Sequence, residues 1–178
     1  MSAKVILLNE HNTLPQRATS ASAGYDVSAR FNLHDELTFY SPRNSHFVKR
    51  TRENEEGNHA IYIAPGERAL IPTGISLDLP DDMWCGVYAR SGTSLKKGLI
   101  ITNGVGVIDA DYKGEVFVSV TNNSTTTVQI EYGEKIAQLI LHRVELFANG
   151  VTVEVERGDG GFGSTTKRKR TKKESVAL

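Results

Sequence analysis

The chain has 178 residues, of which 39% are hydrophobic and 24% are charged, and its formal charge at neutral pH is zero. This length fits one domain with a core of its own, able to bury roughly two-thirds of its unfolded surface. The sequence contains neither a signal peptide nor an apolar run near the roughly 18 residues that span a membrane. We therefore expect a soluble, intracellular protein with no membrane association.

The charges are unevenly distributed along the chain. Six of the 21 Lys and Arg residues, but only one of the 21 Asp and Glu residues, lie in 167–178, which leaves the body with 15 basic and 20 acidic residues. We therefore expect nucleic-acid binding from this tail alone. The single cysteine, Cys85, excludes an internal disulfide, and its apolar surroundings beside Trp84 favour a small core residue over a nucleophile.

Short runs of strand character follow one another from the N-terminus. Lys4 to Leu8 is rich in β-forming residues, and the polar stretch after it is typical of a loop. In Ser22 to Phe31, Tyr25 and Val27 alternate with polar residues. This alternation places Asp26 on the opposite face of the predicted strand.

Residues 38–58 break this pattern. The segment is polar, mixed in charge and longer than most connections in compact domains. We expect a mobile surface insertion, with a partner-binding or lid function as the alternative. A short hairpin around His46 to Lys49 is compatible with the sequence.

Further strands are predicted between turn signals such as Pro65-Gly66 and Pro80-Asp81-Asp82. They cover Ala60–Ile63, Arg68–Ile71, Gly74–Leu79, Met83–Ala89, Glu115–Thr121, Thr127–Ile130, Lys135–Val144 and Val151–Val155. One short helix fits Ser94–Lys97, and no segment indicates a longer amphipathic helix. Many short strands with at most one short helix predict an all-β, single-domain barrel of the jelly-roll type.

The stretch from Asn103 to Phe117 carries the most distinctive chemistry. Its β-branched residues and glycines have poor helix propensity, and the glycines allow a ligand to approach the backbone closely. Asp109 and Asp111 precede Tyr112, and alternating valines then form one face of a strand. We predict a β-hairpin with an acid and an aromatic residue at its turn; a plain hairpin with solvated aspartates is the alternative.

Together with four further segments, this stretch resembles the trimeric dUTP pyrophosphatase (dUTPase) family, in the family's order. The four are SAGYDVSA (Ser22–Ala29), ARSGTSLKKG (Ala89–Gly98), GEKIAQLIL (Gly133–Leu141) and RGDGGFGST (Arg157–Thr165). Each segment alone is a weak signal, whereas five in sequence are specific. The resemblance implies a barrel domain over residues 1–156, a Gly-rich substrate-closing arm over 157–166 and a basic tail over 167–178. Arm and tail hold little that could pack a core, so we expect disorder there without a ligand.

For the central stretch, the resemblance implies a pocket for the uracil base of dUTP. The residues that would line it are Asn103, Gly106, Val107, Ile108 and Phe117. Tyr112 would pack beneath the deoxyribose and exclude a 2′-hydroxyl. Asp109 would act as the general base that activates a water for attack on the α-phosphate, and Asp111 would be a turn residue.

The resemblance also assigns residues to the triphosphate and to a Mg²⁺ ion. Arg90 offers a planar fork of donors, Ser91 a hydroxyl and Gly92 an unobstructed amide. Gln138, a polar residue within an apolar strand, would contact the phosphates or a magnesium-bound water. Asp26 would support the metal indirectly, through water or a basic neighbour.

The Gly-rich arm would close over the bound nucleotide. Arg157 would supply positive charge, Phe162 would stack on the base, and Gly163, Ser164 and Thr165 would contact the terminal phosphate. The arm lacks the lysine of a Walker-type phosphate loop. In this family three chains form one trimer with shared sites, so the implied partners are dUTP and two further copies.

Two alternatives stay open. The related dCTP deaminases use a glutamate at the position that aligns with Ser119, and its absence here argues against deamination. An interaction protein on the same scaffold would use the 38–58 segment or the tail. Lys167–Lys173 fits a nuclear-localisation patch read by an import receptor, a solvated tail, or a weak nucleic-acid contact.

Overall fold

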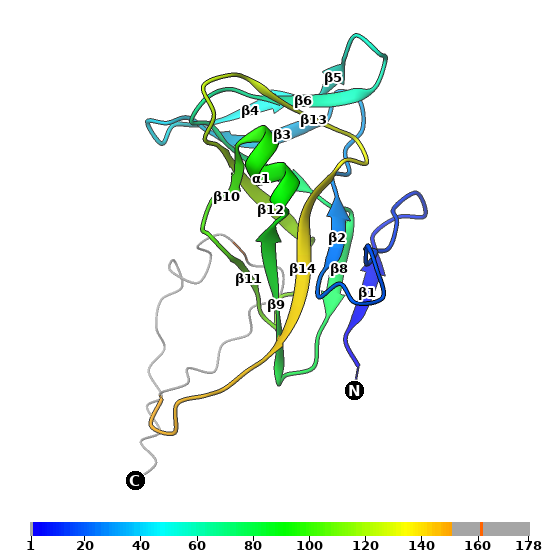
Figure 1. Ribbon diagram of the computed structural model, residues 1–178, viewed down its shortest axis with the longest axis vertical. Coiled ribbons are helices and arrows are strands. Elements are labelled where there is room, and N and C mark those ends of the chain that lie inside the picture. The colour runs from blue at the N-terminus through cyan, green and yellow to red at the C-terminus, as the bar shows by residue number, and fades with distance from the viewer. Residues whose placement is uncertain (1, 151–160, 162–178) are drawn as a thin grey trace.

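The structure of this chain is a computed structural model that describes residues 2–150 and residue 161. Within these residues, 14 strands and one short helix wrap into a jelly-roll-like barrel (Figure 1). All pairings between these strands are antiparallel. The predicted all-β architecture with one short helix is confirmed for this part of the chain. No described helix has the length and apolar character that crossing a membrane requires.

Four hydrogen-bonded sheets make up the barrel. The largest has the strand order β10 (Leu99–Ile101), β12 (Phe117–Asn122), β7 (Arg68–Pro72), β3 (Glu36–Tyr40) and β4 (His46–Arg50). The second has the order β11 (Gly106–Ile108), β9 (Met83–Ala89), β14 (Lys135–Arg143) and β2 (Tyr25–Ser28). The third joins β13 (Val128–Glu131), β6 (His59–Ile63) and β5 (Arg52–Glu53), and the fourth pairs β1 (Lys4–Leu7) with β8 (Ile75–Asp78).

Alternation along the strands sends one set of side chains into a single apolar core between the sheets. Val116, Val118 and Val120 are all buried, on the face that the sequence predicted. Phe39 and Cys85 reach the same core from other strands. Burying one large apolar side chain contributes about 1.5–3 kcal/mol, so this cluster is the main force that holds the sheets together.

The polar segment 38–58 is not the loop insertion that we expected. β3 and β4 form a hairpin of five residue pairs, and β5 pairs with β6. The hairpin extends the largest sheet beyond β7. The segment looks polar because exposed positions dominate it, whereas Phe39 within it and Leu37 just before it are buried. A hairpin does form in this segment, but its turn lies at 41–45, and His46 to Lys49 lie within its second strand rather than at its centre.

Lys49 fastens this hairpin to the barrel. Its ammonium lies 2.5 Å from a carboxylate oxygen of Glu67 and donates to the Tyr62 carbonyl at 3.2 Å. The same ammonium lies 4.9 Å from the ring centre of Phe39 and 5.8 Å from that of Phe47. The side chains of Lys49 and Glu67 are only 29% and 13% exposed, so water screens this pair less than it screens a surface pair.

The stretch from Asn103 to Phe117 is not the hairpin that we predicted. β11 pairs with β9, whereas β12 pairs with β10 and β7, so the strands on either side of Asp109 belong to different sheets. The connecting residues 109–116, which we call the 109–116 loop, cross from one sheet to the other. The core holds both ends of this crossing, because Ile108 packs against it and Val116 is fully buried.

The helix α1 (Ser91–Lys97) begins three residues before its predicted start. Arg90 precedes it in an extended conformation, and Gly98 ends it at φ 67°, the left-handed conformation that commonly closes a helix. The earlier start places Ser91 and Gly92 in the first turn, directly after β9 and Arg90. The residues assigned to phosphate binding therefore lie at a strand-to-helix junction.

Candidate active site

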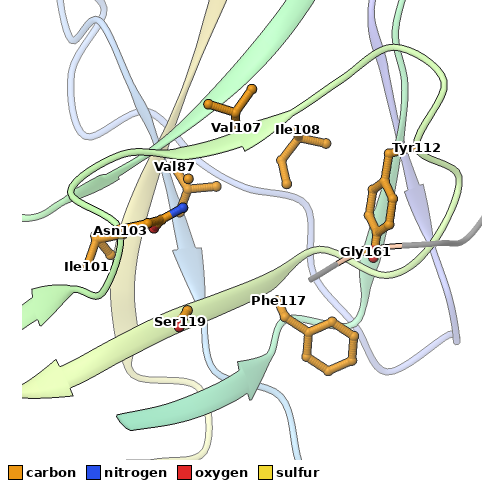
Figure 2. A pocket seen from close by; sticks show the side chains of 10 residues that line it. Val87, Ile101, Asn103, Val107, Ile108, Tyr112, Phe117, Ser119 and Gly161 are labelled. Atoms are coloured by element: carbon orange, nitrogen blue, oxygen red, sulfur yellow. The ribbon is translucent and has the colours of Figure 1, made fainter. Parts of the chain in front are cut away.

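One cavity of about 190 Å³ lies among β9, β10, β11 and β12. Its lining residues are Val87, Ile101, Asn103, Gly106, Val107, Ile108, Tyr112, Phe117, Ser119 and Gly161. Figure 2 shows Asn103 at one end and Tyr112 at the other, with Val107 and Ile108 on one side and Phe117 opposite. All six residues assigned to the base and sugar from the sequence therefore line one cavity.

The pairing of β11 with β9 builds one wall of this cavity. Gly106 lies opposite Val87, and a Cβ on Gly106 would lie only 3.0 Å from the Val87 Cβ. Glycine at this position therefore lets the two strands approach closely.

A tight turn places Asn103 at the end of the cavity. The Gly104 amide donates to the Ile101 carbonyl at 3.0 Å, and Gly104 has a φ of 77° that favours glycine. The Thr102 amide donates to the carbonyl of Ser119 at 2.9 Å, which fixes this turn to β12.

Tyr112 forms the opposite end of the cavity. Its ring is 8% exposed, and its hydroxyl donates to the Glu115 carbonyl at 2.7 Å. A Cβ on Gly114 would lie 2.7 Å from the Tyr112 hydroxyl oxygen, so Gly114 leaves the space that the ring occupies. Gly161 lies against the same ring.

Asp109 follows the cavity-lining residue Ile108 directly. Its carbonyl accepts the Tyr112 amide at 3.2 Å, which closes a turn at the start of the 109–116 loop. Asp109 is half-buried, whereas Asp111 is exposed, in keeping with its predicted place in a turn. The fold thus places Asp109 directly after a lining residue of the cavity and in a backbone hydrogen bond with Tyr112.

The residues assigned to the phosphates and metal form a second group around Asp26. Its carboxylate accepts from the Arg90 Nε at 2.9 Å and lies 3.1 Å from the Lys135 ammonium. Arg90 also donates to the Lys135 carbonyl at 3.0 Å. We call Asp26, Arg90 and Lys135 the ion cluster. Two cations therefore neutralise one carboxylate that is only 12% exposed.

Gln138 lies beside the ion cluster. It pairs with Asp26 of β2 and with Tyr88 of β9, and its amide donates to the Ala89 carbonyl at 3.0 Å. A Cβ on Gly24 would lie 2.8 Å from the Gln138 side-chain oxygen, so Gly24 gives this amide room. The predicted dedicated partner of the Gln138 amide is thus the backbone of β9.

The cavity and the ion cluster lie on opposite faces of the same sheet. Val87 lines the cavity, and successive strand residues face opposite sides, so Tyr88 points away from it. Gln138 and Asp26 pair in register with Tyr88 and share its face. One copy of the chain therefore carries both the cavity residues and the ion cluster, but the sheet separates them.

The face that carries the ion cluster is also partly apolar. The rings of Trp84 and His142 stack at 4.4 Å, and the Tyr88 hydroxyl lies 2.9 Å from His142 Nε2. Ile140 lies between these residues and Gln138 along β14 and is half-buried. An aromatic and aliphatic surface thus borders the residues assigned to the phosphates.

Comparison with known proteins decides the family. The family model for dUTPase matches residues 58–166, more than half of the chain. The deoxyuridine 5′-triphosphate nucleotidohydrolase of Chlamydia muridarum is 36% identical over 162 residues, which cover 89% of this chain and 94% of that protein. The chain belongs to the dUTPase family. The enzyme of the same name from Tolumonas auensis is also 36% identical, over 85% of this chain and 86% of its own.

Solved dUTPase structures share the fold. The crystal structure of a dUTPase from Streptococcus mutans aligns with a TM-score of 0.59 and 26% identity, covering 80% of this chain and 97% of that one. A mutant dUTPase of Staphylococcus bacteriophage 80alpha with dUpNHpp aligns with a TM-score of 0.60 and 24% identity over 92% of this chain and 98% of its own. The jelly-roll-like barrel is thus that of the dUTPase family.

The described part of this dUTPase chain does not form a metal cage by itself. No group of three or more His, Cys, Asp or Glu residues that could hold a metal ion occurs among residues 2–150 and 161. The Asp26 carboxylate is held by two cations instead. The oxygens of Asp26 and Gln138 are of the kind that Mg²⁺ prefers and are compatible with contact through the water shell of such an ion.

Three functional features went unpredicted or lie outside the described residues. Ser119 lines the cavity, and its alternation with two buried valines could have identified it. Lys135 completes the ion cluster, but a register shift in β14 between Lys135 and Ala137 hid its direction from a simple alternation. The arm residues Arg157, Phe162, Gly163, Ser164 and Thr165, the tail 167–178 and the strand predicted at Val151–Val155 lie outside the described residues.

Cys85 behaves as the core residue that the sequence predicted. The thiol is 1% exposed, and burial raises its pKa to about 12, an effect that a hydrogen bond from the Ile140 backbone partly offsets. A thiol with so high a pKa is not a nucleophile at neutral pH.

Proposed function

We propose that this chain hydrolyses dUTP to dUMP and pyrophosphate. The observation that supports this most strongly is the cavity lined by Asn103, Gly106–Ile108, Tyr112 and Phe117, with Asp109 directly after its lining residue Ile108 in the chain. In a member of the dUTPase family, these residues match the parts that a deoxyuridine nucleotide requires: readers for its base, a surface for its sugar and a carboxylate near its phosphates.

The cavity recognises uracil through main-chain groups and one amide. Uracil presents an acceptor–donor–acceptor edge, which Asn103 and the backbone of Gly106–Ile108 complement. Cytosine would place an amino donor against a donor, and leaving such a group unpaired costs about 1–3 kcal/mol, or roughly tenfold to a hundredfold in selectivity. The small volume excludes a 5-methyl group, and the ring of Tyr112 occupies the space that a 2′-hydroxyl needs.

Asp109 acts as the general base. Its carboxylate accepts a proton from a water molecule, which attacks the α-phosphorus in line with the departing pyrophosphate. Arg90, Ser91 and Gly92 stabilise the charge that develops on the phosphate oxygens. Two observations support this role: Asp109 is half-buried at the start of the 109–116 loop, and it follows the cavity-lining residue Ile108 directly.

Asp26 and Gln138 would contact the water shell of a Mg²⁺ ion bound with the nucleotide, and this ion would neutralise triphosphate charge. Lys135 keeps one cation on Asp26 when Arg90 turns to the phosphates, so that the half-buried carboxylate is never left unpaired.

Each site is completed by other copies of the chain in a homotrimer. The cavity and the ion cluster lie on opposite faces of one sheet, so the phosphates of a nucleotide in one copy's cavity meet the ion cluster of another copy. The partly apolar surface around Trp84, Tyr88, Ile140 and His142 supports contact between copies next to that cluster. The arm, through Arg157 and Phe162, then closes over the nucleotide.

Pyrophosphate release from a panel of nucleotides tests this function. We expect turnover of dUTP with Mg²⁺, at least about tenfold lower kcat/KM for dCTP, dTTP and UTP, and strong loss of turnover without the metal. The Asp109→Asn variant should bind dUTP normally and lose about a hundredfold or more in kcat. Near-normal turnover by this variant would refute the base assignment, and ammonia release from dCTP would favour deamination instead.

A further inference from the structure

Glu115 is a charged residue beside the cavity that has no role in the proposed chemistry. One of its carboxylate oxygens accepts two backbone amides of the turn between β7 and β8, from Thr73 at 3.1 Å and from Gly74 at 2.7 Å. Glu115 is half-buried and precedes Val116 and the cavity residue Phe117. Its side chain thus joins the 109–116 loop to a distant turn of the barrel.

Further hydrogen bonds fix the β7–β8 turn to which Glu115 is bonded. Gly74 adopts a φ of 68°, and its carbonyl accepts the Leu8 amide at 3.0 Å and the buried Asn12 side chain at 2.7 Å. The buried Thr73 hydroxyl donates to the Val116 carbonyl. The turn is therefore a fixed point to which the loop can be attached.

Glu115 connects on its other side to Tyr112. The Glu115 carbonyl accepts the Tyr112 hydroxyl at 2.7 Å, and this hydroxyl lies at the end of the ring that forms one end of the cavity (Figure 2). One residue thus binds the barrel through its side chain and the tyrosine through its backbone. A displacement of the Glu115 backbone would therefore also displace the Tyr112 ring, which is hydrogen-bonded to it.

We propose that Glu115 is a positioning residue that sets the preference for a deoxy sugar by fixing the ring of Tyr112. This proposal rests on the proposed function, in which that ring excludes a 2′-hydroxyl. The carboxylate suits the task because a charged acceptor bonds amide donors more strongly than a neutral one does. Only one of its oxygens is used for the two amides, so a glutamine oxygen could replace it.

The test compares kcat/KM for dUTP and UTP in the wild type, Glu115→Ala and Glu115→Gln. We expect Glu115→Ala to lower the dUTP/UTP ratio of kcat/KM about tenfold to a hundredfold, because a displaced ring no longer excludes the ribose. Glu115→Gln should keep the ratio within about threefold of the wild type, since its side-chain oxygen can accept both amides. If Glu115→Ala does not fold, Glu115→Asp, one methylene too short to keep both bonds, replaces it.

Asp35→Ala is the matched control. The Asp35 carboxylate accepts the Asn32 amide at 2.6 Å in an exposed turn that does not line the cavity, so this variant should lose stability and keep the ratio. An unchanged ratio in Glu115→Ala, or an equal change in Asp35→Ala, would overturn the positioning role while leaving dUTP hydrolysis intact. Absence of dUTP turnover in the wild type would overturn the proposed function, and this proposal with it.

Discussion

The shape of the cavity depends on the absence of a Cβ atom at two glycines, Gly106 and Gly114. A methyl group on Gly114 would collide with the Tyr112 hydroxyl, and one on Gly106 would press on Val87. From the sequence, the glycines of this stretch indicated close approach to a ligand. In the structure these two glycines also make room for neighbouring side chains, a role that depends on which strands pair and that no local pattern encodes.

Cys85 makes stability depend on alkaline pH. Its folded pKa of about 12 lies above the ordinary value of 9.0, so above pH 9 the unfolded state loses its thiol proton first. The stability that the protonated thiol contributes is complete below pH 9 and is lost as pH rises toward 12. Between these values we expect the unfolding free energy of the wild type to fall relative to Cys85→Ala by up to about 1.4 kcal/mol per pH unit.

Urea unfolding of both proteins between pH 8 and pH 10.5 measures this difference. Other groups that titrate in this range are shared by the two proteins and cancel in the comparison. Parallel pH profiles would show that the thiol is not held in its protonated form.

At the scale of elements, the β3–β4 hairpin depends on the contacts of Lys49. We expect Lys49→Met to lower the unfolding free energy by about 1–3 kcal/mol, because Glu67 loses its cation and the Tyr62 carbonyl loses a donor. Arg50→Ala is the control, since Arg50 and Glu36 pair on the same hairpin with side chains 72% and 49% exposed. That change should cost less than about 0.5 kcal/mol.

Urea denaturation at one fixed protein concentration measures both values, because assembly makes apparent stability depend on concentration. Equal losses in the two variants would mean that the half-buried pair does not anchor the hairpin.

Local sequence patterns predicted the positions of most strands. They failed where the pairing of strands far apart in the sequence determines the structure. Strands bounded by Pro and Gly turns, such as β6 to β9, lie close to their predicted places. The position and length of the β3–β4 hairpin were not predicted, because few residues, such as Leu37 and Phe39, mark its buried face. β11 and β12 looked like one hairpin, and only the core contacts of Ile108 and Val116 send them to different sheets.

For the whole molecule, the resemblance named the candidate site residues but did not indicate how one chain divides them between two places. The residues for base and sugar converge on one cavity, as expected from the central stretch. Asp26, Arg90 and Gln138 converge on the opposite face of the sheet, with Lys135 as an unpredicted member. Nothing in a linear motif shows on which side of a sheet it will lie, so this separation required the structure.

The central claim is that dUTP is hydrolysed where Asp109 of one copy faces the ion cluster of another. Turnover of dUTP by mixed assemblies of Asp109→Asn and Arg90→Ala, co-expressed with two different tags and purified through both, tests it most directly. A pairing of Asp109→Asn with Asn103→Ala, two changes in the same group, is the control and should not exceed the average of its parents.

We expect the mixed Asp109→Asn and Arg90→Ala assemblies to recover turnover to within about tenfold of the wild type, although each parent alone has lost about a hundredfold or more. Recovery follows because some sites then combine an intact Asp109 with an intact Arg90 from different copies. Turnover no higher than the average of the two parents would contradict the claim.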